Sequence, residues 1–220
     1  MTPRNEEEKD ISEGELDRVI EEAKMGKSAG EDDVPYEMIK HLGPRARAFL
    51  LDMFRRIWRG EEIPQKWRTA NIKTLLKEGK DPEMTDSYRP ISLTSCLGKL
   101  MEKIVADRLT SYMEMNKLLN ENQAGFRKNR CTTDQIHKLV QMAGDKMHEN
   151  AKQPTTMVTF FDFSRAYDKV WREGLLAKMI KLKIPYSFIR YTRLFLSGRR
   201  TMVEINGVRS DEFYLNEGLP

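Results

Sequence analysis

Two aspartates, Asp162 and Asp168, have the side-chain type and spacing that metal chemistry requires. Asp162 directly follows the short apolar run 157–161, and Asp168 comes six residues later. An apolar run of this length is typical of a strand covered on both faces, so Asp162 is predicted at a strand tip where the chain turns outward. Mg²⁺ prefers one or two carboxylates together with phosphate oxygens, so an aspartate there is suited to hold it beside a nucleotide. The spacing alone leaves a structural role open, in which Asp162 caps a turn and Asp168 caps a helix.

The charge of the chain is split between an acidic start and a basic body. Residues 1–33 hold 5 Lys and Arg against 12 Asp and Glu, whereas residues 34–220 hold 33 against 22. Cations that neutralise phosphates gain affinity because they release counterions from a polyanion. The basic excess favours a polyanionic partner, although a solvated basic surface would give the same composition.

Few residues are suited to disulfides or to zinc. The only cysteines are Cys96 and Cys131, and the three histidines are scattered. This argues against a disulfide framework or a zinc site and suits a reducing compartment. No apolar run approaches the roughly 20 residues needed to cross a bilayer, and the charged first ten residues are unlike a secretory signal. We therefore expect an intracellular protein, in the cytoplasm, the nucleus or both, with no membrane partner.

Helical periodicity and turn signals divide the chain into many short elements. Ser12 followed by Glu15 forms a capping box that predicts the first helix. The first part of the chain is predicted to contain that helix up to about Gly26, a short helix at Pro35, an amphipathic helix over 45–59, a hairpin of strands 69–77 and 88–93, and helices over 97–115 and 133–147. The remainder is predicted to contain the strand 157–161, helices over 173–181 and 187–197, and strands 200–205 and 208–215 joined by Asn206 and Gly207. This series predicts an α+β fold.

Several segments carry recognisable motifs in a fixed order. FFDFSRAYDKVW at 160–171 resembles the motif DFSKAFDKV, and NEGLP at 216–220 matches the beginning of GVPQGS. The other matching segments are KSAGEDDVP, similar to KSPGPDGIP, then PQKWRTANIKTLLKEGKDP, SYRPISLTSCLGKLMEKIVADRL, and QAGFRKNRCTTDQI, similar to QFGFRPGRSTTDAI. Together they cover residues 26–220 and resemble the reverse transcriptases of non-LTR retrotransposons of the jockey and related LINE classes. The departures from the pattern are Ala29 for Pro, Thr74 for Pro, Asn129 for Gly and Cys131 for Ser.

The resemblance implies roles for five residues around a polymerase site. Asp162 corresponds to the metal-binding aspartate of motif A, and the carbonyl of Phe163 completes the coordination. Tyr167 matches the aromatic steric gate that lies against the sugar and discourages a 2′-hydroxyl, a position where most relatives have Phe. Lys77 and Arg89 correspond to the cations of the fingers that grip the incoming triphosphate. Cations on phosphate oxygens are what phosphoryl transfer requires.

A second set of residues lies in the motif at 123–136. Gln123, Gly125 and Arg127 resemble a loop that packs near the template, and Arg130 adds a further cation. They are therefore expected to bind nucleic acid. For Arg127 two interpretations stay open, a phosphate contact or a buried structural arginine.

The resemblance also implies an architecture and partners. The expected fold is α+β, with helix-rich fingers, small antiparallel sheets, and a partial palm whose central strand holds Asp162. The expected regions are an acidic leader with the first helix at 1–33, fingers at 34–150, and a partial palm at 151–220 that ends at the start of the GLPQG motif. The partners would be an RNA template, a DNA primer and dNTPs. Two Mg²⁺ ions would serve as cofactors in the complete enzyme.

The sequence lacks one part of the family's metal site. Family members supply further metal carboxylates from a later YADD-type hairpin, which residues 1–220 do not contain. We therefore expect a truncated RNA-directed DNA polymerase that is inactive alone. The alternative is a degenerate, non-catalytic remnant that binds nucleic acid through its basic fingers.

Overall fold

The computed structural model describes residues 9–149, 157–205 and 207–219. The chain divides into two compact units. The first contains Met1–Ser111 and Arg165–Pro220, and the second contains Tyr112–Ser164. None of the described helices has the length and apolar character to cross a membrane.

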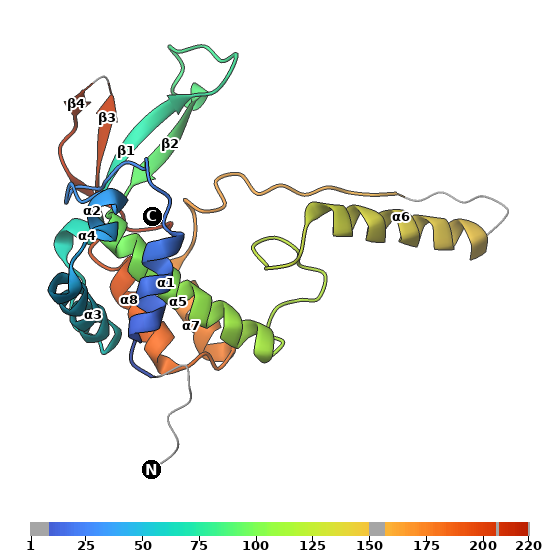
Figure 1. The fold of residues 1–220 in the computed structure, drawn as a ribbon. Coiled ribbons are helices and arrows are strands. Elements are labelled where there is room, and N and C mark those ends of the chain that lie inside the picture. Colours follow the sequence, from blue (N-terminus) through green and yellow to red (C-terminus); the bar gives the residue numbers. More distant parts are fainter. Residues whose placement is uncertain (1–8, 150–156, 206, 220) are drawn as a thin grey trace. The chain divides into compact units, whose positions relative to one another are not determined.

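The first unit is built around one mixed sheet (Figure 1). β1 (Thr69–Leu76) pairs antiparallel with β2 (Tyr88–Leu93), which confirms the predicted hairpin. On its other edge β1 pairs in parallel with β3 (Arg200–Ile205). The expectation of antiparallel sheets alone was therefore wrong. Parallel strands need a long crossover connection, and the long stretch of chain between β1 and β3, which includes several helices, provides it.

The last two strands complete the sheet beside β3. β4 (Val208–Arg209) and β5 (Phe213–Tyr214) both pair antiparallel with β3. The single strand expected at 208–215 is thus two short strands, because the chain between them leaves the ladder. Gly207 has a left-handed φ of 80° in the turn before β4, as the predicted hairpin requires, whereas Asn206 lies outside the described residues.

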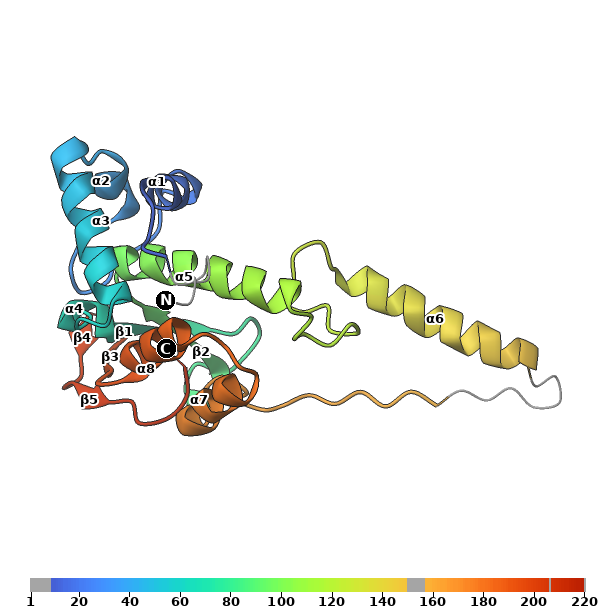
Figure 2. The ribbon, with the colours of Figure 1, turned by 90° about the horizontal axis from the view of Figure 1, so that it is seen from below.

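Helices form the rest of the first unit, and most agree with the predicted ranges. Their bounds are α1 (Glu13–Glu22), α2 (Tyr36–Lys40), α3 (Pro44–Trp58), α4 (Gln65–Arg68), α5 (Cys96–Met115), α7 (Arg172–Lys181) and α8 (Tyr186–Leu196), with a 3₁₀ turn at Thr85–Ser87. The predicted capping box of α1 is confirmed, since the Glu15 amide donates to Ser12 Oγ and the Ser12 amide donates to Glu15 Oε2. In Figure 2, α5 runs between α1 on one side and α7 and α8 on the other.

The core of this unit is made of apolar helix faces and aromatic rings. Trp58 is almost fully buried, and its ring meets Phe188 edge to face at a centroid distance of 5.3 Å. Phe54 meets the ring of Trp67 in the same way at 5.9 Å. Edge-to-face pairs of this kind stabilise the fold by more than the burial of their apolar surface alone would. Helices α3 and α8 are thereby fixed to the region that leads into β1.

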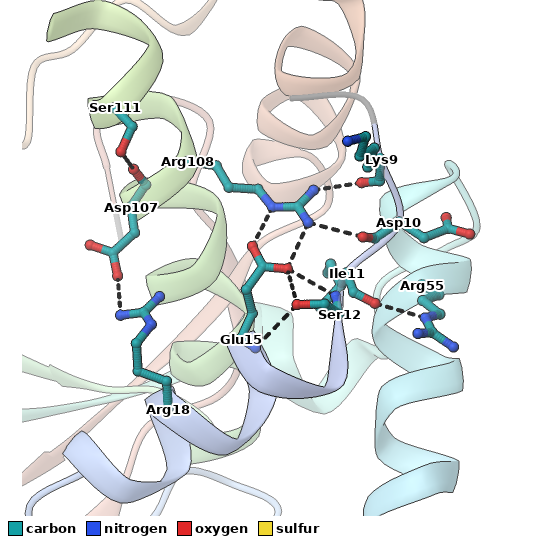
Figure 3. A network of polar contacts seen from close by, with 10 residues as sticks. All are labelled: Lys9, Asp10, Ile11, Ser12, Glu15, Arg18, Arg55, Asp107, Arg108 and Ser111. Carbon is teal, nitrogen blue, oxygen red and sulfur yellow. Dashed lines mark hydrogen bonds and ion pairs between the residues drawn. The ribbon is translucent and has the colours of Figure 1, made fainter. Parts of the chain in front are cut away.

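A polar network ties the described start of the chain to α3 and α5 (Figure 3). Arg108 of α5 donates to both carboxylate oxygens of Glu15, at 2.6 and 2.7 Å, and to the carbonyls of Lys9 and Asp10. Arg55 of α3 donates to the carbonyl of Ile11 at 2.7 Å. Although burial raises the pKa of Glu15, the hydrogen bonds from Arg108 and Ser12 outweigh it, and the pKa lies below its usual value.

The acidic start also neutralises arginines of α3. Arg47 pairs with Asp17 at 2.7 Å, and Arg59 pairs with Asp10. Arg56 of the same helix pairs with Glu61 at 2.7 Å. Much of the charge on α3 is therefore compensated within the protein, so the cations suited to a polyanion must be sought elsewhere.

The second unit contains α6 (Thr132–Glu149), which confirms the helix predicted at 133–147. Asp134 caps its start by accepting from the Cys131 amide at 2.9 Å. Residues 157–163 of the same unit form no strand and are exposed. The prediction of a buried strand at 157–161 with Asp162 at its tip was wrong. A strand is stable only when neighbouring strands bond its backbone, and among the described residues none pairs with this run.

Candidate functional site

Lys77 and Arg89 lie on the same face of the β1–β2 hairpin. Arg89 stands opposite Leu75 in the register, and the Lys77 amide extends the ladder by donating to the Ser87 carbonyl at 2.8 Å. Because side chains alternate along a strand, positions 75 and 77 point to the same side as 89. Lys77 and Arg89 are thus diagonal neighbours, a relation that typically separates residues by about 7–8 Å. The hairpin presents two cations together near its tip.

The turn at 164–169 approaches the tip of this hairpin. The ammonium of Lys77 donates to the carbonyl of Asp86 at 2.7 Å, and the guanidinium of Arg165 lies 3.9 Å from the Asp86 carboxylate. Arg165 takes a left-handed φ of 55° at the start of the turn, and Tyr167 stands in its middle with an exposed side chain. The turn that contains Tyr167 therefore approaches the hairpin that carries Lys77 and Arg89 through the exposed Arg165–Asp86 pair.

The segment before the C-terminus is fastened to the same turn. The Leu219 amide donates to the Tyr167 carbonyl, and the Gly218 amide donates to the Val170 carbonyl, both at 3.0 Å. Gly218 has a φ of 75°, and a Cβ there would lie 2.5 Å from the Asp168 carbonyl oxygen. Only glycine permits this approach without strain. The two segments that resemble motif A and the start of GVPQGS thus lie against each other.

Arg172 stabilises the contact between the turn and the segment before the C-terminus. Its guanidinium donates to the carbonyls of Leu196, Leu215, Glu217 and Gly218 at distances between 2.7 and 3.1 Å. Burial lowers the pKa of Arg172 from its usual value. The sequence analysis did not identify Arg172. Its acceptors are backbone carbonyls more than 20 positions away in the chain, and such contacts produce no local sequence pattern.

Asp162 and Phe163 belong to the second unit and are exposed on an irregular segment. Among the residues that the structure describes, no group of three or more His, Cys, Asp or Glu is placed to hold a metal ion. Mg²⁺ needs several oxygen ligands. One carboxylate and one carbonyl therefore do not form a magnesium site by themselves, and further oxygens would have to complete it.

The loop at 120–130 of the second unit is organised by Arg127. Its guanidinium forms a two-pronged contact with Glu114, at 2.8 and 2.6 Å, and donates to the carbonyls of Asn120 and Gln123. The Gln123 side chain donates to the Gly125 carbonyl at 3.3 Å. The hydrogen bonds from Arg127 lower the pKa of Glu114. These contacts fit the structural interpretation of Arg127.

Arg130 lies in the same loop and differs from Arg127. Its side chain is exposed, and its guanidinium donates to the Glu121 carbonyl at 3.4 Å, a long and weak contact. Of the two arginines expected to bind nucleic acid, Arg130 is therefore the one whose guanidinium is held less firmly by the loop.

Comparison with known proteins identifies the family of the chain. Residues 75–220 match the family model described as reverse transcriptase (RNA-dependent DNA polymerase), and the chain belongs to this family. Within it, the chain is a reverse transcriptase domain of the non-LTR retrotransposon type.

Three relatives support that assignment. The chain is 34% identical over 210 residues to the probable RNA-directed DNA polymerase from transposon BS of Drosophila melanogaster. It is 32% identical to the RNA-directed DNA polymerase from mobile element jockey of Drosophila funebris, and 31% identical to the probable polymerase from transposon X-element of Drosophila melanogaster. Each match covers 94% of this chain but 22% of the relative, so the chain spans about a fifth of the length of these relatives.

Proposed function

We propose that this chain forms the nucleotide- and template-handling part of an RNA-directed DNA polymerase. In this proposal Lys77 and Arg89 bind the triphosphate of an incoming dNTP, and Tyr167 lies against its sugar. The observation that carries the proposal is the convergence of three motifs in the first unit, where the Lys77 side chain and Arg165 both reach Asp86 and the segment before the C-terminus lies against Tyr167.

Physical chemistry supports this assignment of roles. Catalysis of phosphoryl transfer depends chiefly on positioning and on cations placed at the phosphate oxygens. A hairpin that presents two cations on one face supplies such charges from a rigid element. The exposed ring of Tyr167 offers a flat apolar surface for a deoxyribose, and an added 2′-hydroxyl would meet that ring.

Mg²⁺ is the proposed cofactor, with Asp162 and the carbonyl of Phe163 among its ligands. Bound Mg²⁺ would neutralise charge on the phosphate oxygens. Because the described residues do not form a metal cluster, we propose that residues 1–220 alone do not extend a primer. An RNA template and a DNA primer are the proposed partners, with Gln123, Gly125, Arg127 and Arg130 forming or supporting the template contact.

Primer extension and RNA binding test this proposal together. The purified chain, given a primed RNA template, dNTPs and Mg²⁺, should show no extension; extension that disappears in Asp162→Ala would contradict the incomplete site. RNA binding should be salt-dependent and unaffected by Asp162→Ala, but weakened by Arg130→Ala. RNA affinity that does not change with salt would contradict a template role.

A second candidate function is non-catalytic binding of nucleic acid. The exposed irregular segment around Asp162 and the lack of a metal cluster among the described residues favour it. Nucleotide selectivity separates the two candidates. A preference for dNTP over NTP that is lost in Tyr167→Ala supports the polymerase, whereas RNA binding without any affinity for nucleoside triphosphates supports the non-catalytic function.

A further inference from the structure

A basic pocket in the first unit has none of the residues assigned above to the nucleotide in its lining. It is a cavity of about 440 Å³ between the start of α7, the end of α8 and the segment that follows β5. The lining of this α7–α8 pocket includes Lys169, Trp171, Arg193, Arg199 and Tyr214. A cavity of this size, with cations and aromatic rings in its wall, is suited to a charged aromatic ligand.

Trp171 supplies an exposed and fixed aromatic ring. Its relative exposure is 74%, whereas Trp58 and Trp67 are buried at 2% and 6%. The indole lies directly over Gly174 in the first turn of α7, so closely that a Cβ there would overlap the ring. Glycine lowers helix stability relative to alanine, and here it makes room for the ring against the backbone. One side of the indole is thus held by the helix while much of the ring faces solvent.

Arg199 supplies a buried cation in the wall of the pocket. Only 1% of the residue is exposed, and its guanidinium lies 4.6 Å from the centre of the Phe195 ring. One nitrogen, Nη1, donates to the Phe195 carbonyl at 2.9 Å. The other two, Nε and Nη2, have no hydrogen-bond partner among the described residues. Buried donors are normally paired, so part of this guanidinium's charge is not compensated by hydrogen bonds from the described residues.

Arg199 keeps its positive charge although its side chain is buried. Burial lowers its pKa to about 10, while nearby Glu102 acts in the opposite direction, so the guanidinium stays protonated at neutral pH. Glu102 is half-buried, and burial raises its pKa, while the charge of Arg199 acts in the opposite direction.

The rim of the pocket adds further charges of both signs. Lys169 and Arg193 are exposed cations there, and Glu173 and Glu217 are the acidic residues of the lining. The cations outnumber the acids when Arg172 and Arg199 are included. The pocket is therefore an electropositive surface beside an open aromatic ring.

We propose that the α7–α8 pocket is a binding site for single-stranded nucleic acid, in which a base stacks on Trp171, the neighbouring phosphates contact the exposed Lys169 and Arg193, and the buried charge of Arg199 adds to the attraction. Aromatic rings that stack bases, combined with cations that follow the backbone, are how proteins hold single strands. An acidic peptide would use the cations but would gain little from the indole. The inference takes its ligand class from the proposed function, but none of its ligand-binding residues belongs to the nucleotide or metal set.

Tryptophan fluorescence tests the proposal, because Trp171 is the exposed one of three tryptophans. Adding an oligouridylate to the protein should quench the exposed component and protect it from acrylamide. Trp171→Ala should weaken oligouridylate binding about tenfold. Gly174→Ala, which displaces the ring, should weaken binding to a similar degree. Arg193→Glu should weaken binding more than Lys181→Glu, a matched charge reversal at the far end of α7 and outside the pocket.

Three results would overturn the proposal. They are an oligouridylate affinity unchanged in Trp171→Ala, equal effects of the two charge reversals, and displacement of the oligonucleotide by polyglutamate at matched charge. The Lys77→Ala/Arg89→Ala variant separates this site from the proposed nucleotide site. Quenching of Trp171 should persist in that variant. If quenching is absent in the wild type while dNTP binding depends on Lys77 and Arg89, the pocket proposal fails and the proposed function stands.

Discussion

Gly218→Ala tests whether the segment before the C-terminus is fastened to the turn around Tyr167. The backbone of Gly218 has a φ of 75°, in the left-handed region, and an added Cβ would lie 2.5 Å from the Asp168 carbonyl oxygen. Placing an L-residue in that region costs about 1–2 kcal/mol. The overlap is with backbone atoms, which cannot rotate away, and overpacking of this kind costs about 1–3 kcal/mol. We expect Gly218→Ala to destabilise the first unit by about 2–5 kcal/mol.

Urea unfolding, followed by the fluorescence of buried Trp58 and Trp67, measures this loss. Amide exchange should also accelerate at Gly218 and Leu219, whose N–H groups donate to the carbonyls of Val170 and Tyr167. Gly14→Ala is the matched control. Gly14 lies in α1 with open space around its Cβ position, so alanine there should stabilise by about 0.5–1 kcal/mol.

An unchanged urea midpoint and unchanged protection of both amides in Gly218→Ala would refute this reasoning. The same would follow if Gly14→Ala destabilised the protein as much. In either case the close approach of the two motifs would not be a property of the folded protein.

Two further changes test the electrostatics of the first unit. Hydrogen bonds from Asn71, Lys73 and Arg209 lower the pKa of Glu204 to about 2. The contribution of Glu204 to stability should therefore be complete above its ordinary pKa of 4.5 and should disappear as the pH falls towards 2. An NMR titration of the Glu204 carboxyl measures this pKa, and a midpoint near 4.5 would contradict the contacts between β1 and β3. Arg108→Lys removes the two-pronged contact with Glu15 and should lower the free energy of unfolding by about 1–3 kcal/mol. Thermal unfolding measures this loss. An unchanged melting temperature would show that the network in Figure 3 does not stabilise the protein.

Elements with local signals were predictable from the sequence. The capping box at Ser12 and the turn residues between β1 and β2 act within a few positions, so the first helix and the hairpin lie where the pattern placed them. The strand predicted at 157–161 failed because an apolar run does not specify its pairing partner. The parallel pairing of β1 with β3 joins residues more than a hundred positions apart, and local periodicity contains no information about it.

The residues of the candidate site came from motifs matched residue by residue, and their roles stay predictions. Lys77, Arg89 and Tyr167 were identified from motif positions; the structure places Lys77 and Arg89 on one face of the β1–β2 hairpin, and the role of Tyr167 stays a prediction. Arg172 and Trp171 were missed, because their importance depends on acceptors and on a cavity formed by distant parts of the chain.

Equilibrium binding of a dNTP to the purified protein tests the proposed role of the β1–β2 hairpin most directly. Each charge-assisted contact with a phosphate contributes about 1.5–3 kcal/mol, so Lys77→Ala/Arg89→Ala, which removes two of them, should bind at least about a hundredfold more weakly than the wild type. Lys80→Ala, which removes an exposed cation from the loop of the same hairpin, should bind like the wild type. Equal affinities for the wild type and the double variant would contradict a nucleotide role for this face.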